Sequence, residues 1–285
     1  MLPGTPPLEG LHTLRTLDAC AAIAAAFSAG PRRVAVVGGG FIGAEVAATA
    51  RSRGLEVTLV EALPVPLGRA LGAQVGAVCA AIHADHGVDV RLGVGVDGFD
   101  GDDRVERVRP ADGTTVDADV VFVGVGVAPT TAWLEGSGLT LDDGVLCDET
   151  CLAAPGVVAA GDVARWRHPG YDAPIRVEHW DNAAEQGAHA ARRLLAGDGR
   201  AEAYAPVPWV WSDQYDRKIQ MAGRPGPRDE MRVVDGSLAE RRFVAVYGRG
   251  GRVTGVVGMN RPSVVTRYRM LLAQGPVTWD EATTS

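Results

Sequence analysis

The stretch VAVVGGGFIGAEVAATARSRGLEVTLVE, residues 34–61, decides the fold of this chain. A short apolar run leads into three glycines at fixed spacing, Gly38, Gly40 and Gly43, and a helical segment follows them. A second apolar run then ends on Glu61, 18 residues after the third glycine. This order of strand, glycine turn, helix, strand and terminal acid predicts a βαβ unit that binds a dinucleotide. An ordinary strand–helix–strand unit with a glycine-rich turn is the competing interpretation.

Each part of the unit has a physical task. The first glycine lets the chain turn sharply, the second lets the backbone approach the pyrophosphate, and the third lets helix and strand pack closely. The phosphates sit on unpaired N–H groups at the helix start. An acid at the position of Glu61 hydrogen-bonds the adenosine ribose and would repel a 2′-phosphate, so it favours NAD(H) over NADP(H). Arg69 lies nearby in the sequence and could weaken that preference.

Composition excludes several classes of protein. With 46% hydrophobic and 22% charged residues, the 285-residue chain is globular, and it is long enough for one large domain or two to three small ones. The net charge of −7 argues against a nucleic-acid surface, and no apolar run approaches the length of a membrane span. The four cysteines form no C-x-x-C pair, so we expect free, buried thiols in a reducing, cytoplasmic setting.

Charge is distributed unevenly along the chain. Residues 207–285 carry 12 basic and 8 acidic side chains, whereas residues 1–206 carry 16 basic and 27 acidic ones. The basic end is suited to an acidic partner, for which Arg261, Arg267 and Arg269 are the candidates. A solvated basic face is an equally good interpretation of the same residues.

The remaining elements are expected to be short. A helix capped by Thr16 or Asp18 is expected to run to about Ser28. Further expectations up to the middle of the chain are a loop over 63–71, a helix over 76–86, an antiparallel meander within 88–116 and a buried strand over 118–127. Those for the second half are a strand over 157–160, an amphipathic helix over 182–195 closed by Gly197, strands over 243–247 and 253–257, a helix over 263–273 and a polar tail over 282–285.

The histidines do not indicate a metal site or a nucleophilic relay. His83 and His86 stand at helical spacing but lack further ligands, so a solvated helix face is expected. His168 and His179 have no serine or cysteine partner that suggests a nucleophile. We therefore predict no metal and no catalytic side chain in the usual sense.

Several motifs together resemble the FAD-dependent, NADH-using ferredoxin reductases. These belong to the wider pyridine nucleotide–disulfide reductase-like flavoproteins and serve bacterial oxygenase and cytochrome P450 systems. The resemblance covers nearly all of the chain, and its combination of motifs is specific. The matching stretches are residues 2–4, 14–16, 38–61, 124–129, 155–162, 178–183 and 211–214.

The resemblance implies an α/β fold with three parts. They are a Rossmann-like NAD domain, the remaining part of a Rossmann-like FAD domain, and a small α+β C-terminal interface domain. By this resemblance, residues 1–31 are the end of the first FAD segment with a connecting helix, 32–128 the NAD domain, 129–206 the second FAD segment and 207–285 the interface domain.

One departure from the family concerns the start of the chain. The family begins with its own strand–G-x-G-x-x-G–helix unit for the FAD pyrophosphate. Here 33 residues with one expected helix precede Val34, which is too few for a βαβ unit. We therefore expect a family member that lacks roughly its first hundred residues, the size of such a unit. A misassigned start, a split gene and a decayed copy all stay open.

The resemblance also assigns roles to single residues. Asp162 would accept a hydrogen bond from the flavin ribityl chain, and a helix N-cap is its alternative role. Trp180 and Trp211 would lie near the flavin ring, and Glu45 near the nicotinamide. The full predicted cofactor set is Gly38, Gly40, Phe41, Ile42, Gly43, Glu45, Glu61, Arg69, Gly126, Gly161, Asp162, Glu178, His179, Trp180 and Trp211.

The function that the resemblance implies is that of a flavoprotein reductase with FAD and NAD(H). Hydride would pass from NADH to FAD, and single electrons would then pass to an acidic [2Fe-2S] ferredoxin or similar carrier. We expect a monomer or homodimer. The alternatives are a truncated, impaired NAD-binding remnant without the FAD pyrophosphate site and, last, a flavin-free dehydrogenase.

Overall fold

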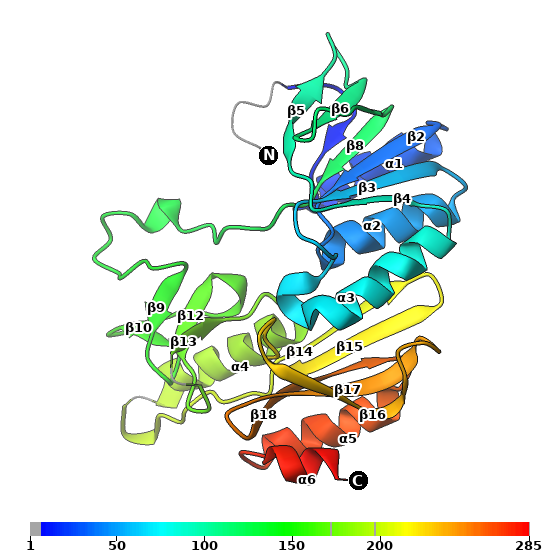
Figure 1. Cartoon of the computed structure of the whole chain (residues 1–285). Helices are drawn as coiled ribbons and strands as arrows, with labels where there is room; N and C mark the ends of the chain where they lie inside the picture. Colours follow the sequence, from blue (N-terminus) through cyan, green and yellow to red (C-terminus); the bar gives the residue numbers. More distant parts are fainter. Residues whose placement is uncertain (1–6, 172, 197, 285) are drawn as a thin grey trace.

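The computed structural model describes residues 7–171, 173–196 and 198–284. It consists of three bodies: a parallel-sheet unit, a small middle body, and a C-terminal antiparallel sheet covered by two helices (Figure 1). Residues 2–4, which carry part of the family resemblance, lie outside the described residues.

The first body is a five-stranded parallel sheet in the order β1-β8-β2-β3-β4. Helices α1 and α2 pack on one face, and a small antiparallel meander packs on the other. The strands are β1 (Leu11–His12), β2 (Arg33–Val37), β3 (Glu56–Glu61), β4 (Asp89–Leu92) and β8 (Val120–Val123). The other elements are α1 (Leu17–Ser28), α2 (Phe41–Ser52), α3 (Gly68–Asp85), β5 (Val96–Asp100), β6 (Arg107–Pro110) and β7 (Val116–Asp117).

The sequence predicted several of these elements correctly. Thr16 caps α1, because its side chain accepts a hydrogen bond from the Ala19 N–H at 3.1 Å. The predicted meander is present as β5, β6 and β7. Strand β4, however, joins the parallel sheet instead.

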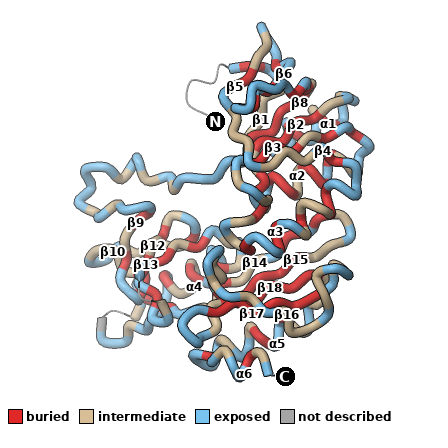
Figure 2. Tube along the Cα trace, viewed as in Figure 1, coloured by how far each residue is buried: buried red, intermediate tan, exposed pale blue. Residues whose placement is uncertain are grey.

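Two boundaries differ from the expected ones. The predicted loop over 63–71 is partly wrong, because α3 begins at Gly68 and Leu71 is fully buried against the C-terminal sheet. The predicted strand over 118–127 is too long: β8 ends at Val123, and Val125 is 52% exposed where the chain leaves the sheet. The connection beyond it runs largely over the surface (Figure 2).

The middle body has a mixed three-stranded sheet in the order β13-β12-β9 around the buried Trp166. Its elements are η1 (Ala132–Leu134), β9 (Val145–Cys147), β10 (Leu152–Ala154), β11 (Val157–Val158), η2 (Gly161–Val163), β12 (Ala164–Arg167), β13 (Pro174–Arg176), α4 (Trp180–Ala196) and η3 (Asp198–Arg200). The predicted strand over 157–160 shrinks to the two residues of β11, which pair with β10 at the surface.

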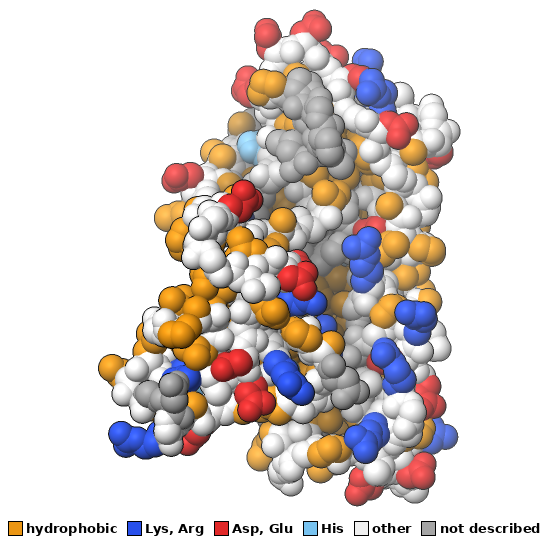
Figure 3. Space-filling model, turned by 90° about the vertical axis from the view of Figure 1, so that its left-hand side faces the viewer, with side chains coloured by type: hydrophobic (Ala, Val, Ile, Leu, Met, Phe, Trp, Pro, Cys, Tyr) orange, Lys and Arg blue, Asp and Glu red, His pale blue; other side chains and the backbone are white. Residues whose placement is uncertain are grey.

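Helix α4 buries polar side chains on its inward face and exposes some of its large apolar ones. Its inward face carries the polar side chains of Asn182 and Gln186, which are satisfied because Gln186 accepts from the Gly161 N–H at 2.9 Å and Asn182 donates to the Val177 carbonyl at 3.2 Å. Trp180 and Leu195 are exposed on the same helix. Figure 3 views the molecule from the side of this body and shows hydrophobic side chains among charged ones. The predicted closing residue, Gly197, lies outside the described residues.

The third body is an antiparallel sheet in the order β14-β15-β18-β17-β16. Helices α5 and α6 cover one face, and α3 of the first body packs on the other. The elements are β14 (Trp209–Gln214), β15 (Arg217–Gly223), β16 (Glu230–Ser237), β17 (Arg242–Arg249), β18 (Arg252–Met259), α5 (Pro262–Ala273) and α6 (Trp279–Thr283). The predicted polar tail is partly wrong, because Ala282 belongs to α6 and is 1% exposed.

The predicted solvated face for His83 is also wrong. His83 is fully buried between α3 and the C-terminal sheet, where its Nδ1 lies 3.0 Å from the Tyr215 hydroxyl. The Tyr215 ring stacks on His86, with ring centroids 3.7 Å apart. Of the four free cysteines, Cys20 is exposed and the other three are buried. None of the helices in the described part of the chain is long and apolar enough to cross a bilayer.

Candidate nucleotide-binding site

The glycine turn between β2 and α2 leaves no room for side chains at two of its positions. Gly38 has φ +100°, which favours glycine, and a Cβ there would overlap the Gly124 carbonyl oxygen. A Cβ at Gly43 would overlap the Gly38 carbonyl oxygen. Both glycines therefore hold helix α2 tightly against the ends of β2 and β8.

Gly40 has a different role. Its φ of −70° suits any residue, and a Cβ built on it would have no atom within 4 Å. It is the N-cap of α2 and provides no side chain to cap the helix. The open space above Gly40 thus faces the helix start, where backbone N–H groups and the helix dipole bind phosphate. A dinucleotide pyrophosphate fits this cradle.

Glu61 closes one end of the cradle. Its carboxylate, in a residue only 9% exposed, accepts from the Gly39 N–H at 2.5 Å and from the Leu63 N–H at 2.7 Å. Each carboxylate oxygen carries two lone pairs, so acceptor capacity is left for ribose hydroxyls. Glu61 and Arg69 both line a cavity of about 350 Å³ beside the glycine turn. This cavity is suited to the adenosine half of a dinucleotide.

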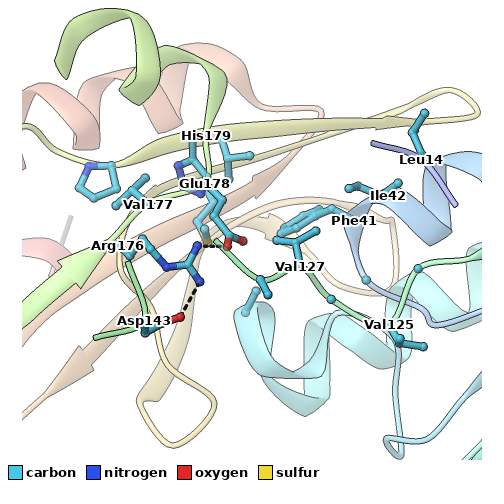
Figure 4. A pocket seen from close by; sticks show the side chains of 18 of the residues that line it. Leu14, Phe41, Ile42, Val125, Val127, Asp143, Arg176, Val177, Glu178 and His179 are labelled. Atoms are coloured by element: carbon cyan, nitrogen blue, oxygen red, sulfur yellow. Dashed lines mark hydrogen bonds and ion pairs between the residues drawn. The ribbon is translucent and has the colours of Figure 1, made fainter. Parts of the chain in front are cut away.

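A larger cleft of about 980 Å³ opens on the other side of the turn. All three bodies contribute to its walls, and Figure 4 shows Phe41 and Ile42 facing the Arg176–Glu178 side across it. The lining residues are 13–15, 40–42, 45, 70, 122–128, 130, 143, 165, 174–179, 208, 210, 211, 221 and 223–225. The two spaces adjoin, because both are bordered by Gly40, Phe41, Ala70 and Gly124–Gly126.

Arg176 organises the wall contributed by the middle body. It donates to Glu178, to Asp143 Oδ1 at 3.1 Å and to the Asp162 carbonyl at 3.2 Å. Burial lowers its pKa, but the bonds to Asp143 and Glu178 outweigh burial and leave the pKa raised. The guanidinium therefore stays charged and fixes the segment on which Glu178 and His179 lie.

Glu45 connects the first body to the third. Its Oε1 accepts from the Ser212 hydroxyl of β14 at 2.5 Å. Burial raises the pKa of Glu45, and the bond from Ser212 opposes that shift. Trp211, the neighbour of Ser212, is 40% exposed and lines the cleft.

The predicted cofactor residues fall into three groups. Those that line the larger cleft are Gly40, Phe41, Ile42, Glu45, Gly126, Glu178, His179 and Trp211. Those that line the smaller cavity are Gly38, Gly40, Phe41, Glu61, Arg69 and Gly126. Those that line neither are Gly43, which is buried beneath the turn, Gly161, Asp162 and the 77% exposed Trp180. The individual roles stay predictions.

Sequence reasoning missed several residues of the cleft. Arg176 and Ser212 lie beside or within matched motifs, so their neighbours Glu178 and Trp211 were a usable signal. Asp143 gave no signal, because only the fold brings it to Arg176. No cluster of His, Cys, Asp and Glu that could hold a metal occurs among the described residues.

Comparison with known proteins agrees with this geometry. Residues 1–187 match the family model described as pyridine nucleotide-disulphide oxidoreductase, and residues 209–283 match one described as reductase C-terminal. The chain is 40% identical over 271 residues to the 5,5′-dehydrodivanillate O-demethylase ferredoxin reductase subunit of Sphingobium sp., aligning 94% of this chain with 65% of that protein.

Two further relatives extend the comparison. Rhodocoxin reductase of Rhodococcus erythropolis is 37% identical over 279 residues, covering 96% of this chain and 64% of that protein. The structure of the covalent putidaredoxin reductase–putidaredoxin complex matches with a TM-score of 0.86 and 34% identity, over 92% of this chain and 63% of that chain.

The chain thus spans less than two thirds of the length of these proteins. The matches confirm the resemblance and the α/β fold class with its C-terminal reductase domain. Since the glycine turn, the terminal acid and the matched family model all lie in the same segment, the chain belongs to the pyridine nucleotide–disulphide oxidoreductase family.

Proposed function

We propose that this chain is the NADH-using part of a flavoprotein reductase that serves a ferredoxin-like electron carrier. The observation that carries the proposal is the open cradle above Gly40, with Glu61 at one end and a cleft built by three bodies at the other. Members of this family use FAD and NAD(H), and the relatives named above are reductases of such carriers.

The residues of the first body fit NAD(H). The helix start at Gly40 and Phe41 would hold the pyrophosphate, and Glu61 would accept from the adenosine ribose. A carboxylate held this firmly would repel a 2′-phosphate, which favours NADH over NADPH. The nicotinamide half would then extend past Phe41 into the larger cleft.

The far wall of the cleft fits the reacting end of a flavin. FAD, when bound, accepts hydride and releases electrons one at a time. Glu178, His179 and Trp211 would border its ring, and the exposed Asp162 would accept from its ribityl chain. Arg176 fixes this wall through Asp143 and the Asp162 carbonyl, so the protein's part is to hold and orient.

For the electron acceptor we propose an acidic [2Fe-2S] ferredoxin. The basic surplus of residues 207–285 supports it, and so does the similarity of the chain to putidaredoxin reductase in its complex with putidaredoxin. Arg261, however, is tied to Asp235 at 2.8 Å, and Arg269 lies 4.0 Å from Glu185, which leaves the exposed Arg267 as the better candidate on that segment. A monomer or homodimer stays a prediction.

Anaerobic reduction of the flavin tests this function. The purified protein is mixed with FAD, and excess flavin is removed. We expect a retained yellow absorbance that NADH bleaches and oxidised ferredoxin restores. A protein that binds NADH but retains no flavin would support the NAD-binding remnant instead. A retained flavin that NADH does not bleach would contradict the proposed reaction.

A further inference from the structure

A polar chain of three side chains crosses from the third body into the cleft. Gln214 Nε2 donates to the Ser212 hydroxyl oxygen at 3.1 Å, and the Ser212 hydroxyl donates to Glu45 Oε1 at 2.5 Å. Ser212 is fully buried and Gln214 is 2% exposed, so water does not compete for these bonds. A charge-assisted bond in such surroundings is among the stronger hydrogen bonds in proteins.

The donor and acceptor of each hydrogen bond in this row of three side chains are fixed. An amide NH₂ only donates and a carboxylate only accepts, so the hydroxyl of Ser212 is committed as donor toward Glu45. Asp213, the charged neighbour on β14, raises the pKa of Glu45 through repulsion, whereas its backbone N–H lowers it. The bond from Ser212 is thus the main contact that opposes the rise in the Glu45 pKa caused by burial and by Asp213.

The position of Glu45 places these three hydrogen-bonded side chains beside the expected path of the nucleotide. The pyrophosphate cradle lies at Gly40, and the adenosine side is marked by Glu61 in the smaller cavity. The other half of a dinucleotide must run toward the larger cleft, on whose wall Glu45 lies one helical turn beyond Phe41. A fixed carboxylate there attracts the positive ring of NAD⁺ more than the neutral ring of NADH.

We propose that Ser212 is a positioning residue for the nicotinamide end of the bound nucleotide: it holds the Glu45 carboxylate on the cleft wall and thereby sets the balance between NAD⁺ and NADH. This inference rests on the proposed function and names a determinant inside its site. The effect concerns the product as much as the substrate, because a carboxylate that favours NAD⁺ slows its release.

Calorimetric titration with three ligands tests the proposal. ADP-ribose has the adenosine half and the pyrophosphate but no nicotinamide, so it reports the cradle alone. In Ser212→Ala we expect NAD⁺ affinity to fall about tenfold or more, the effect of one hydrogen bond to a charged group. Binding of ADP-ribose should stay within about twofold, and NADH should change less than NAD⁺.

Two more variants keep the test decisive. Glu45→Gln should reproduce the loss for NAD⁺, and the double variant should lose little more, because both changes remove the same interaction. Ser237→Ala is the matched control, since the Ser237 hydroxyl oxygen only accepts from the Glu240 N–H, at 3.2 Å on β16. This control should leave all three affinities unchanged.

The titrations distinguish a failure of the positioning role of Ser212 from a failure of the proposed function. If Ser212→Ala leaves NAD⁺ binding unchanged while ADP-ribose still binds, the positioning role is wrong and the proposed function stands. If all three ligands weaken equally, Ser212 merely supports the fold and the positioning role is again wrong. If none of the three binds the wild-type protein, the proposed function itself fails.

Discussion

Single residues divide the glycine turn into positions that shape the fold and one that is left for a ligand. Gly38 and Gly43 have no room for a Cβ, whereas Gly40 has free space on the side of the helix start. Glu61 ties the turn to the end of β3 through the Gly39 N–H. The sharp turn at Gly38 and the close packing at Gly43 follow from local spacing, so the glycine pattern was sufficient to predict them, whereas the bond between Glu61 and the Gly39 N–H was not predicted.

Alanine substitutions should separate the two kinds of glycine. Gly38→Ala places a side chain at φ +100° and against the Gly124 carbonyl, so we expect a loss of about 2 kcal/mol or more in the free energy of unfolding. Gly40→Ala is the matched control and should change that free energy by less than about 0.5 kcal/mol. Urea unfolding measures both, and equal losses would contradict the assignment.

At the scale of elements, helix α3 shares one core with the C-terminal sheet. Leu71, Val75, Cys79 and Ile82 of α3 pack against side chains of β15, β17 and β18, and His83 is buried beside them. Helical spacing predicted the helix but not which of its faces another body covers. This is why the start of α3 and the burial of His83 were missed, while the cap of α1 was found.

His83 should make stability depend on pH. Burial, with a smaller contribution from the charge of His86, lowers its pKa from 6.5 to about 4, and a hydrogen bond donated to the Gln214 side chain opposes this shift. The unfolded chain takes up the proton below about pH 6.5 and the folded chain only near pH 4. Stability is therefore lost as pH falls between these values, by about 3 kcal/mol at most. Urea unfolding of the wild type and of His83→Gln should show a flatter pH dependence in the variant, and parallel curves would contradict it.

A buried tyrosine offers a second test of the packing of α3 against the C-terminal sheet. The Tyr247 hydroxyl of β17 donates to the Leu71 carbonyl of α3 at 2.6 Å. Tyr247→Phe leaves that carbonyl unpaired and should cost about 1–2 kcal/mol of unfolding free energy. Tyr268→Phe is a matched control within the third body, where the hydroxyl donates to the Ala282 carbonyl. If only the control loses stability, α3 is not held as described.

At the scale of the whole molecule, three bodies meet at one cleft. Its walls combine residues 13–15, 122–128, 174–179 and 223–225, which are far apart in the sequence. The nucleotide-binding motif could be predicted from the sequence, because a βαβ unit is built from one continuous stretch of residues. The Arg176–Asp143 pair and the Ser212–Glu45 bond could not, because each joins residues that only tertiary packing brings together. The domain boundaries stay predictions.

The most direct test of the account is calorimetric titration of the purified protein with NADH. We predict saturable binding to the wild type and a loss of more than about tenfold in affinity in Gly40→Val, because a Cβ at this position meets no atom within 4 Å and the added side chain occupies the space of the phosphate cradle. Unchanged binding in a folded Gly40→Val, or no binding to the wild type, would contradict it.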